Sequence, residues 1–284
     1  MNRPVVAPRF CGSDCAGQIK RFLAGFTAPA EPARPLAGIV PHAGWMFSGA
    51  VAAKVITCFD SASPETFVLF GATHRGVRRM SVFPSGRWDT ALGEIEIDDQ
   101  LAERLLERCP DRLTGDPSAH AGEHAIEVQL PMIQHLYPGA RVVPIAAPPS
   151  PDAAEAGAAV GAVLAESDRP VAVLGSTDLT HYGAMNYEFA PWGTGAAARE
   201  KMIANDRRII DLMLALDADH IVAEAAEHHN ACGAGAIAAT IGAARAMGAH
   251  KGALIDYTTS HDVLGDPPGS FEMAVGYAGV VFGP

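Results

Sequence analysis

The sequence lacks any apolar run long enough to cross a membrane. Glycine, proline or charged residues interrupt the apolar runs of the 284-residue chain well short of the roughly 20 residues that a span needs. The first ten residues, Met1 to Phe10, contain no continuous apolar region of signal-peptide length. We therefore expect no membrane partner and a cytoplasmic location.

Positive charge is also scarce. The chain has 21 Lys and Arg residues against 32 Asp and Glu residues, which gives a formal net charge of -11. No basic stretch is available to neutralise phosphates, so we expect no nucleic-acid partner and little attraction to anionic membrane surfaces. A small-molecule or peptide ligand is the remaining class of partner.

The cysteines do not form the framework of a disulfide-rich protein. Cys11, Cys15, Cys58, Cys109 and Cys232 are odd in number and widely spaced in a large chain. The first two are four residues apart, without a second pair or a nearby histidine, which is a poor match to a zinc signature. We expect free, reduced thiols.

Short apolar runs alternate with segments of helical spacing along the chain. The runs predict strands at 36–40, 66–70, 140–147, 170–175, 252–258 and 272–282, a short strand at 80–84 and a hairpin at 88–97. Helical spacing predicts helices at 18–26, 48–59, 98–108, 118–137, 152–166 and 196–216, with one more ending at 247. No repeat or long linker divides the sequence, so we expect a single α/β domain over residues 1–284, with 1–35 as an irregular segment packed on it. Its central sheet should be mixed but largely parallel and flanked by helices.

Residues that can carry chemistry follow several of these predicted strands. His42, His74 and the pair Asp178 and His181 come after strands, and Cys232 precedes a small-residue helix. The carboxyl ends of strands in an open α/β sheet meet at one edge, where ligands bind. Two imidazoles and a thiolate from separate elements would form an open metal site that prefers Fe(II), Cu or Zn to Mg or Ca.

Neighbouring residues suggest supporting roles. Asp178 is close enough in sequence to orient His181 for proton transfer, and a helix start would favour the anionic form of Cys232. On the predicted 118–137 helix, His124 and Glu127 would share a face.

Each residue also has a purely structural explanation. A histidine at a strand end can serve as a hydrogen-bonded structural residue, a cysteine can pack as a small apolar side chain, and Asp178 can cap its own turn. His120, His124 and Glu127 could lie on a solvated helix face. The joint occurrence favours a site, because all of these structural explanations would have to hold together.

The motifs in order are Pro41-His42-Ala43-Gly44 with Ser48-Gly49, Gly71-x-x-His74, Glu123-His124-x-x-Glu127-x-x-Leu130-Pro131, Ser176-x-Asp178-x-x-His181-x-Gly183 and Cys232-Gly233. From about residue 36 to the C-terminus, their order and spacing resemble the Memo family, whose bacterial and archaeal members are often named AmmeMemoRadiSam system protein B. That family is related to the class III extradiol dioxygenases, which are non-haem iron enzymes that open catechol rings.

The resemblance implies a fold like that of the class III extradiol dioxygenases and a metal cleft. By position, His42, His74 and Cys232 would be the metal ligands, Asp178 and His181 would line the cleft, and His124 would be a further acid or base. The dioxygenases use a glutamate as third ligand, so the cysteine marks the Memo side of the relationship and argues against ordinary catechol cleavage. The stretch Phe10-Cys11-Gly12-Ser13-Asp14-Cys15 departs from the aromatic-rich Ala-Gly-x-x-Tyr-Pro type usual in the family, which implies a different cleft entrance if this segment borders it.

Our leading hypothesis is a metal-binding protein with oxidoreductase or dioxygenase-like chemistry. Fe(II), or else Cu or Zn, would be held by His42, His74 and Cys232, with open positions for O₂ or a substrate oxygen. His181, oriented by Asp178, would move a proton with the help of His124. One alternative is a non-catalytic protein that binds a ligand or peptide in the same cleft. Another is a hydrolase or transferase with Cys232 as nucleophile. The sequence leaves the substrate and the oligomeric state open.

Overall fold

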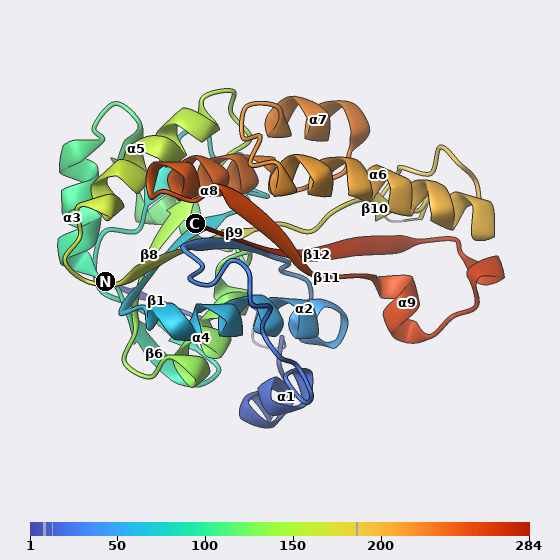
Figure 1. Cartoon of the computed structure of the whole chain (residues 1–284), viewed down its shortest axis with the longest axis horizontal. Helices are drawn as coiled ribbons and strands as arrows, with labels where there is room; N and C mark the ends of the chain where they lie inside the picture. The colour runs from blue at the N-terminus through green and yellow to red at the C-terminus, as the bar shows by residue number, and fades with distance from the viewer. Residues whose placement is uncertain (8–9, 13, 186) are drawn as a thin grey trace.

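A mixed β-sheet forms the centre of the molecule (Figure 1). The computed structural model describes residues 1–7, 10–12, 14–185 and 187–284, and over these residues the sheet has the strand order β10-β12-β2-β9-β3-β8-β4-β7, with β11 also paired to β12. Its strands are β2 (Ala37–Val40), β3 (Thr66–Gly71), β4 (Met80–Val82), β7 (Leu113–Gly115), β8 (Arg141–Ala146), β9 (Val171–Ser176), β10 (His181–Tyr182), β11 (Lys251–Thr259) and β12 (Ala274–Gly283).

The four strands β2, β9, β3 and β8 run parallel and form the core of this sheet. The strands on either side of this core, β12 and β4, are antiparallel to their neighbours β2 and β8. The predicted α/β fold with a mixed sheet and a parallel centre is therefore confirmed. Strands such as β3 and β12 are buried at every position, because helices cover both faces of the sheet.

Helices pack on the two faces in separate apolar cores (Figure 1). One core contains buried residues of α3 (Asp99–Arg108), α5 (Ala153–Ala165), α6 (Ala196–Leu214), α7 (Ile221–His228) and α8 (Ala234–Ala246). The other contains α1 (Cys15–Phe22), α2 (Trp45–Thr57) and α4 (Leu130–Leu136). The short α9 (Ser260–Leu264) links β11 to the loop before β12.

The register of the parallel strands aligns the ends that carry the candidate residues. Ser176 at the end of β9 lies opposite Val40 of β2 on one side and Gly71 of β3 on the other. His42, Asp178 and His74 follow these positions by two, two and three residues. Three neighbouring strands therefore deliver their polar side chains to one edge of the sheet at the same level.

The hairpin predicted at 88–97 belongs to a second, small sheet rather than to the central one. β5 (Arg87–Thr90) and β6 (Gly93–Glu96) pair with each other, and β1 (Asn2–Arg3) pairs with β5. The chain therefore begins with a short strand within the segment that we expected to be irregular. The helix predicted at 18–26 is α1, which begins at Cys15 because the Asp14 side chain accepts a hydrogen bond from Gly17 N.

The helix predicted over 118–137 is largely wrong. Only α4 is an α-helix there, and before it the chain makes two short 3₁₀ turns, η2 (Pro117–His120) and η3 (Glu127–Gln129). Gly122 between them has a φ of +72°, which ends any helical path. His124 and Glu127 consequently do not share a helix face.

The expectation of free thiols is wrong for one pair of cysteines. Cys11 and Cys15 form a disulfide, because the turn into α1 brings their Cα atoms within 5.1 Å. Cys58, Cys109 and Cys232 are free. Ser13, between the paired cysteines, lies outside the described residues. Across the described parts of the chain, no helix is both long and apolar enough to cross a membrane.

Candidate metal centre

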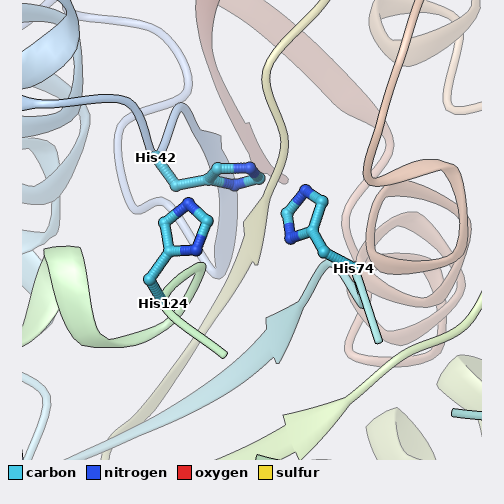
Figure 2. A group of neighbouring side chains, drawn as sticks. All are labelled: His42, His74 and His124. Carbon is cyan, nitrogen blue, oxygen red and sulfur yellow. The ribbon is translucent and has the colours of Figure 1, made fainter. Parts of the chain in front are cut away.

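Three histidines converge at the edge of the sheet where the parallel strands end (Figure 2). His42 follows β2, His74 follows β3, and His124 lies in the turn before η3. One nitrogen of each ring lies within 4.8 Å of the corresponding nitrogens of the other two. The rings of His74 and His124 are stacked, and that of His42 lies nearly perpendicular to both.

Hydrogen bonds determine the tautomer of His42, which is almost fully buried. Ser176 Oγ donates to the carbonyl of Ala125 at 2.7 Å, which uses its only proton. His42 Nδ1 lies 2.8 Å from the same oxygen and must therefore donate to it. This leaves the lone pair of His42 Nε2 free for a metal ion or a proton donor.

Cys232 and Asp178 lie at this free nitrogen. Cys232 Sγ is 3.4 Å and Asp178 Oδ2 is 4.0 Å from His42 Nε2. Asp178 Oδ1 accepts a hydrogen bond from His42 N at 2.8 Å, and Asp178 N donates to Cys232 Sγ at 3.3 Å. Cys232 and Asp178 thus lie beside His42, whereas, among the described residues, the group whose ligand atoms all lie within 4.8 Å of one another is His42, His74 and His124 and does not include Cys232.

Cys232 is held here by the close packing of the next residue. A Cβ on Gly233 would lie 2.4 Å from the Ser176 carbonyl oxygen, so only glycine permits this approach to β9. Cys232 precedes Gly233, the residue that caps α8, and therefore lies outside the helix. Burial and then the Asp178 carboxylate raise the pKa of the Cys232 thiol, contrary to our expectation of an anion-favouring helix start.

Glu123 orients the other two histidines. Its carboxylate accepts hydrogen bonds from His74 N at 2.7 Å and His74 Nδ1 at 3.0 Å, and from His124 N at 2.8 Å. Since His74 Nδ1 donates to a carboxylate, its Nε2 is the nitrogen left for a metal. Sequence analysis assigned Glu123 no role, although its place directly before His124 in the motif was a signal.

Burial and neighbouring charges shift the pKa values of the three histidines in different directions. Burial lowers the pKa of His42 to about 4, despite the opposing effect of Asp178. Burial also lowers the pKa of His124, whereas the hydrogen bond to Glu123 raises the pKa of His74. Burial of Glu123 favours its neutral form, but hydrogen bonds from His74 and from Ala125 N outweigh it and lower the pKa of the carboxyl. The cluster therefore combines one anion, the Glu123 carboxylate, with ring nitrogens that bind metal when they are neutral.

His181 is not oriented by Asp178. Its Nδ1 donates to the Leu179 carbonyl at 2.9 Å, and within the described residues no hydrogen bond or ion pair joins it to the Asp178 carboxylate. Nε2 of the neutral ring therefore carries the lone pair. Both residues line a cavity of about 550 Å³ beside the histidine cluster.

Buried polar residues outside the motifs support this loop. Asp206 Oδ1 accepts from Thr180 N at 2.9 Å, and Asn205 Nδ2 donates to Thr180 Oγ1 at 3.1 Å. Burial raises the pKa of Asp206 to about 6. Neither residue has a periodicity or motif that singles it out, because its role depends on how α6 packs beside β12.

Phe10 comes from the N-terminal segment to the site. Its ring stacks on His124 with the centroids 5.9 Å apart. This segment therefore borders the histidine cluster, which meets the condition under which its departure from the family pattern would change the cleft entrance.

One pair of the predicted ligands has the spacing that a transition-metal ion requires. With metal–nitrogen bonds of about 2.0 Å and metal–sulfur bonds of about 2.3 Å, a nitrogen and a sulfur ligand of one ion lie roughly 3.1–3.6 Å apart. His42 Nε2 and Cys232 Sγ, at 3.4 Å, meet this condition. The three ring nitrogens that lie within 4.8 Å of one another form the second group that could hold an ion.

Comparison with known proteins agrees with the motif pattern. The family model described as Memo-like protein matches residues 11–281. A MEMO1 family protein of Methanopyrus kandleri is 40% identical over 257 residues, which cover 87% of this chain and 83% of that protein. A MEMO1 family protein of Thermococcus onnurineus is 34% identical, with 98% of each chain covered. Among solved structures, an uncharacterized protein of Escherichia coli K12 has a TM-score of 0.55 at 15% identity, covering 88% of this chain and all of that one, which is a likeness of fold alone.

Proposed function

The chain belongs to the Memo family, and from this premise we propose that it is a metal-dependent oxidoreductase with a non-haem iron centre. The ligands in this proposal are His42, His74 and Cys232, with Cu or Zn as alternative metals. The observation that carries it is the position of Cys232 Sγ, 3.4 Å from the unprotonated Nε2 of a histidine in a three-histidine cluster. A bound iron ion would supply redox and Lewis-acid chemistry at this edge of the sheet.

The residues of the chain would hold the site and move protons. Asp178 fixes the backbone of His42, and Glu123 fixes the ring of His74. His181 Nε2 is not used by the bond to the Leu179 carbonyl and would accept a proton from a substrate in the adjoining cavity. His124 is the second acid or base, and it remains the alternative third ligand because it belongs to the cluster.

Two observations count against Cys232 as a nucleophile. The raised pKa of its thiol disfavours the thiolate, and Asp178 contacts His42 instead of activating His181. The base pair of His181 and Asp178 that this alternative requires is therefore not formed.

The experiment is metal loading of the full chain purified without oxygen, followed by O₂-uptake measurements with a panel of catechols. We expect one Fe(II) per chain and metal-dependent O₂ uptake. His42→Gln and His74→Gln should each weaken metal binding by on the order of 100-fold or more. Cys232→Ser should weaken it as well, whereas His124→Gln should keep the metal and lose turnover.

The control is His220→Gln, which changes an exposed histidine bonded to Asp217 on the surface. Equal metal binding by the His42→Gln variant and the unchanged chain would refute the metal centre. Full metal occupancy without O₂ uptake or any change in metal redox behaviour would leave a binding protein and refute the oxidoreductase.

A further inference from the structure

A cavity next to the histidine cluster is lined by aromatic and acidic side chains. It measures about 550 Å³ and lies between the start of α2, β10, α9 and β12. Asp178 lines it and also contacts His42, so the cavity opens directly beside the candidate metal centre. This volume is within the range of pockets that hold small organic molecules.

Aromatic rings form part of the cavity wall, and the carboxylates in the wall are negatively charged. Phe47, Tyr187 and Tyr277 provide ring surface. The carboxylates are Asp178, at the inner end, with Asp266 and Glu272 on exposed loop positions, and none of the described lining residues is a lysine or arginine. Burial and then Asp178 raise the pKa of both tyrosines, which keeps the phenols neutral at physiological pH.

Within the described part of the chain, His261 lacks the hydrogen bonds that a buried polar side chain usually makes. It is 4% exposed, lines the cavity, and packs edge-on against Phe271. Neither of its ring nitrogens has a hydrogen-bond partner among the described residues, and both are closed off from solvent, so the ring meets the cavity through its carbon atoms. The nearest carboxylate oxygen, of Asp262, is 3.9 Å away, beyond hydrogen-bond range. An unsatisfied buried donor and acceptor are costly, so such a group is usually completed by water or by a ligand.

We propose that this cavity binds a small hydroxylated arylalkylamine, with its ammonium group attracted by the carboxylates, its ring against the aromatic walls and its hydroxyl hydrogen-bonded to His261, whose ring turns to present a nitrogen to the cavity. The proposal rests on the proposed function, because it names the substrate class of the same site. Carboxylates that have no lysine or arginine among the described residues around them repel carboxylate and phosphate ligands. Aromatic faces attract an organic cation through their π-electrons, which adds to the preference for an amine.

The test compares two probes that share a phenol ring and differ in the sign of their charge. Tyramine carries an ammonium group, and 4-hydroxyphenylacetate carries a carboxylate. Binding to the full chain is measured by titration calorimetry at low salt, both as a metal-free protein and after Fe(II) loading without oxygen. We expect tyramine to bind at least about tenfold more tightly than the acid in both forms.

Variants separate the parts of the site. His261→Phe keeps an aromatic ring against Phe271 and removes both nitrogens, and it should weaken tyramine binding by about tenfold. Glu272→Gln should weaken tyramine binding and leave or strengthen binding of the acid. Glu103→Gln, at an exposed position of α3 outside this cavity, should change neither affinity. The melting temperature of each variant verifies that it is folded, and Glu272 is an exposed position where a change should not disturb the core.

The outcomes also distinguish this inference from the proposed function. If the chain takes up no Fe(II) on loading but still binds tyramine through His261, the result would support the cavity and refute the metal centre. Metal binding in a chain that shows no saturable tyramine binding in the millimolar range would refute the cavity alone. Equal affinity for the two probes, or an unchanged affinity in His261→Phe, would also overturn the proposal.

Discussion

At the scale of single residues, the candidate centre depends on hydrogen bonds that select one nitrogen of each ring. Ser176 Oγ accepts a hydrogen bond from His42 Nδ1, and the Glu123 carboxylate accepts one from His74 Nδ1. Each of these histidines then presents Nε2. Such partners affect metal affinity because they orient the ring and raise its basicity.

Glu123 therefore gives a direct prediction. Replacing it by glutamine in Glu123→Gln removes the charge that holds His74 Nδ1–H and should lower metal affinity by about 10- to 100-fold. The measurement is competition with a chromogenic chelator at pH 7. Glu94→Gln, which removes an exposed pair with Arg87, is the control and should leave the affinity unchanged. An affinity equal to that of the unchanged chain would show that Glu123 does not orient the ligand.

At the scale of secondary-structure elements, the first strand secures the loop that carries Glu123 and His124. Arg3 in β1 is buried, forms a 2.7 Å ion pair with Glu127, and donates to the carbonyls of His120 and Glu123. Its guanidinium lies 3.9 Å from the centre of the Trp88 ring in β5. A segment with little regular structure is thus tied to a small sheet by one side chain.

Loss of the Arg3 side chain should lower the free energy of unfolding. Arg3→Met leaves the buried Glu127 carboxylate without its counter-charge and should destabilise the fold by about 3–5 kcal/mol. Arg87→Met removes an exposed pair on the same small sheet and should cost no more than about 1 kcal/mol. Urea unfolding followed by fluorescence measures both. Similar losses in the two variants would contradict the structural role given to Arg3.

At the scale of the whole molecule, buried neutral histidines couple stability to pH. Burial lowers the pKa of His120 to about 4, and the ring donates from Nε2 to the Ser81 carbonyl at 2.9 Å. An unfolded chain binds the proton near pH 6.5, so it holds more protons than the folded chain between pH 6.5 and 4. Stability from this group is therefore complete above pH 6.5 and falls as the pH drops towards 4.

His120→Gln should reduce this dependence. The glutamine amide can donate to the same carbonyl but does not titrate, so acidification from pH 7 to about 4.5 should cost the variant roughly 2–3 kcal/mol less than the unchanged chain. Urea unfolding at the two pH values gives this difference. His220→Gln, at an exposed position, should retain the dependence of the unchanged chain. The same slope in His120→Gln would rule out this assignment.

The sequence by itself determined the α/β architecture and the strands that end at the site. Apolar runs of strand length predict buried strands, and parallel neighbours must end at the same edge, so His42, His74 and Asp178 could be grouped before any coordinates. Periodicity failed at 118–137, because Gly122 and the side-chain bonds of Glu123 to its own loop outweigh helical spacing.

Only the tertiary structure decided what each side chain contacts. Asp178 is three residues from His181 in sequence, yet its carboxylate bonds to His42, because β2 and β9 are neighbours in the sheet. The role of Glu123 and the unsatisfied ring of His261 likewise depend on packing between distant segments. Local sequence records which groups a strand delivers to an edge, whereas hydrogen bonding and burial depend on the neighbours that the fold brings to them.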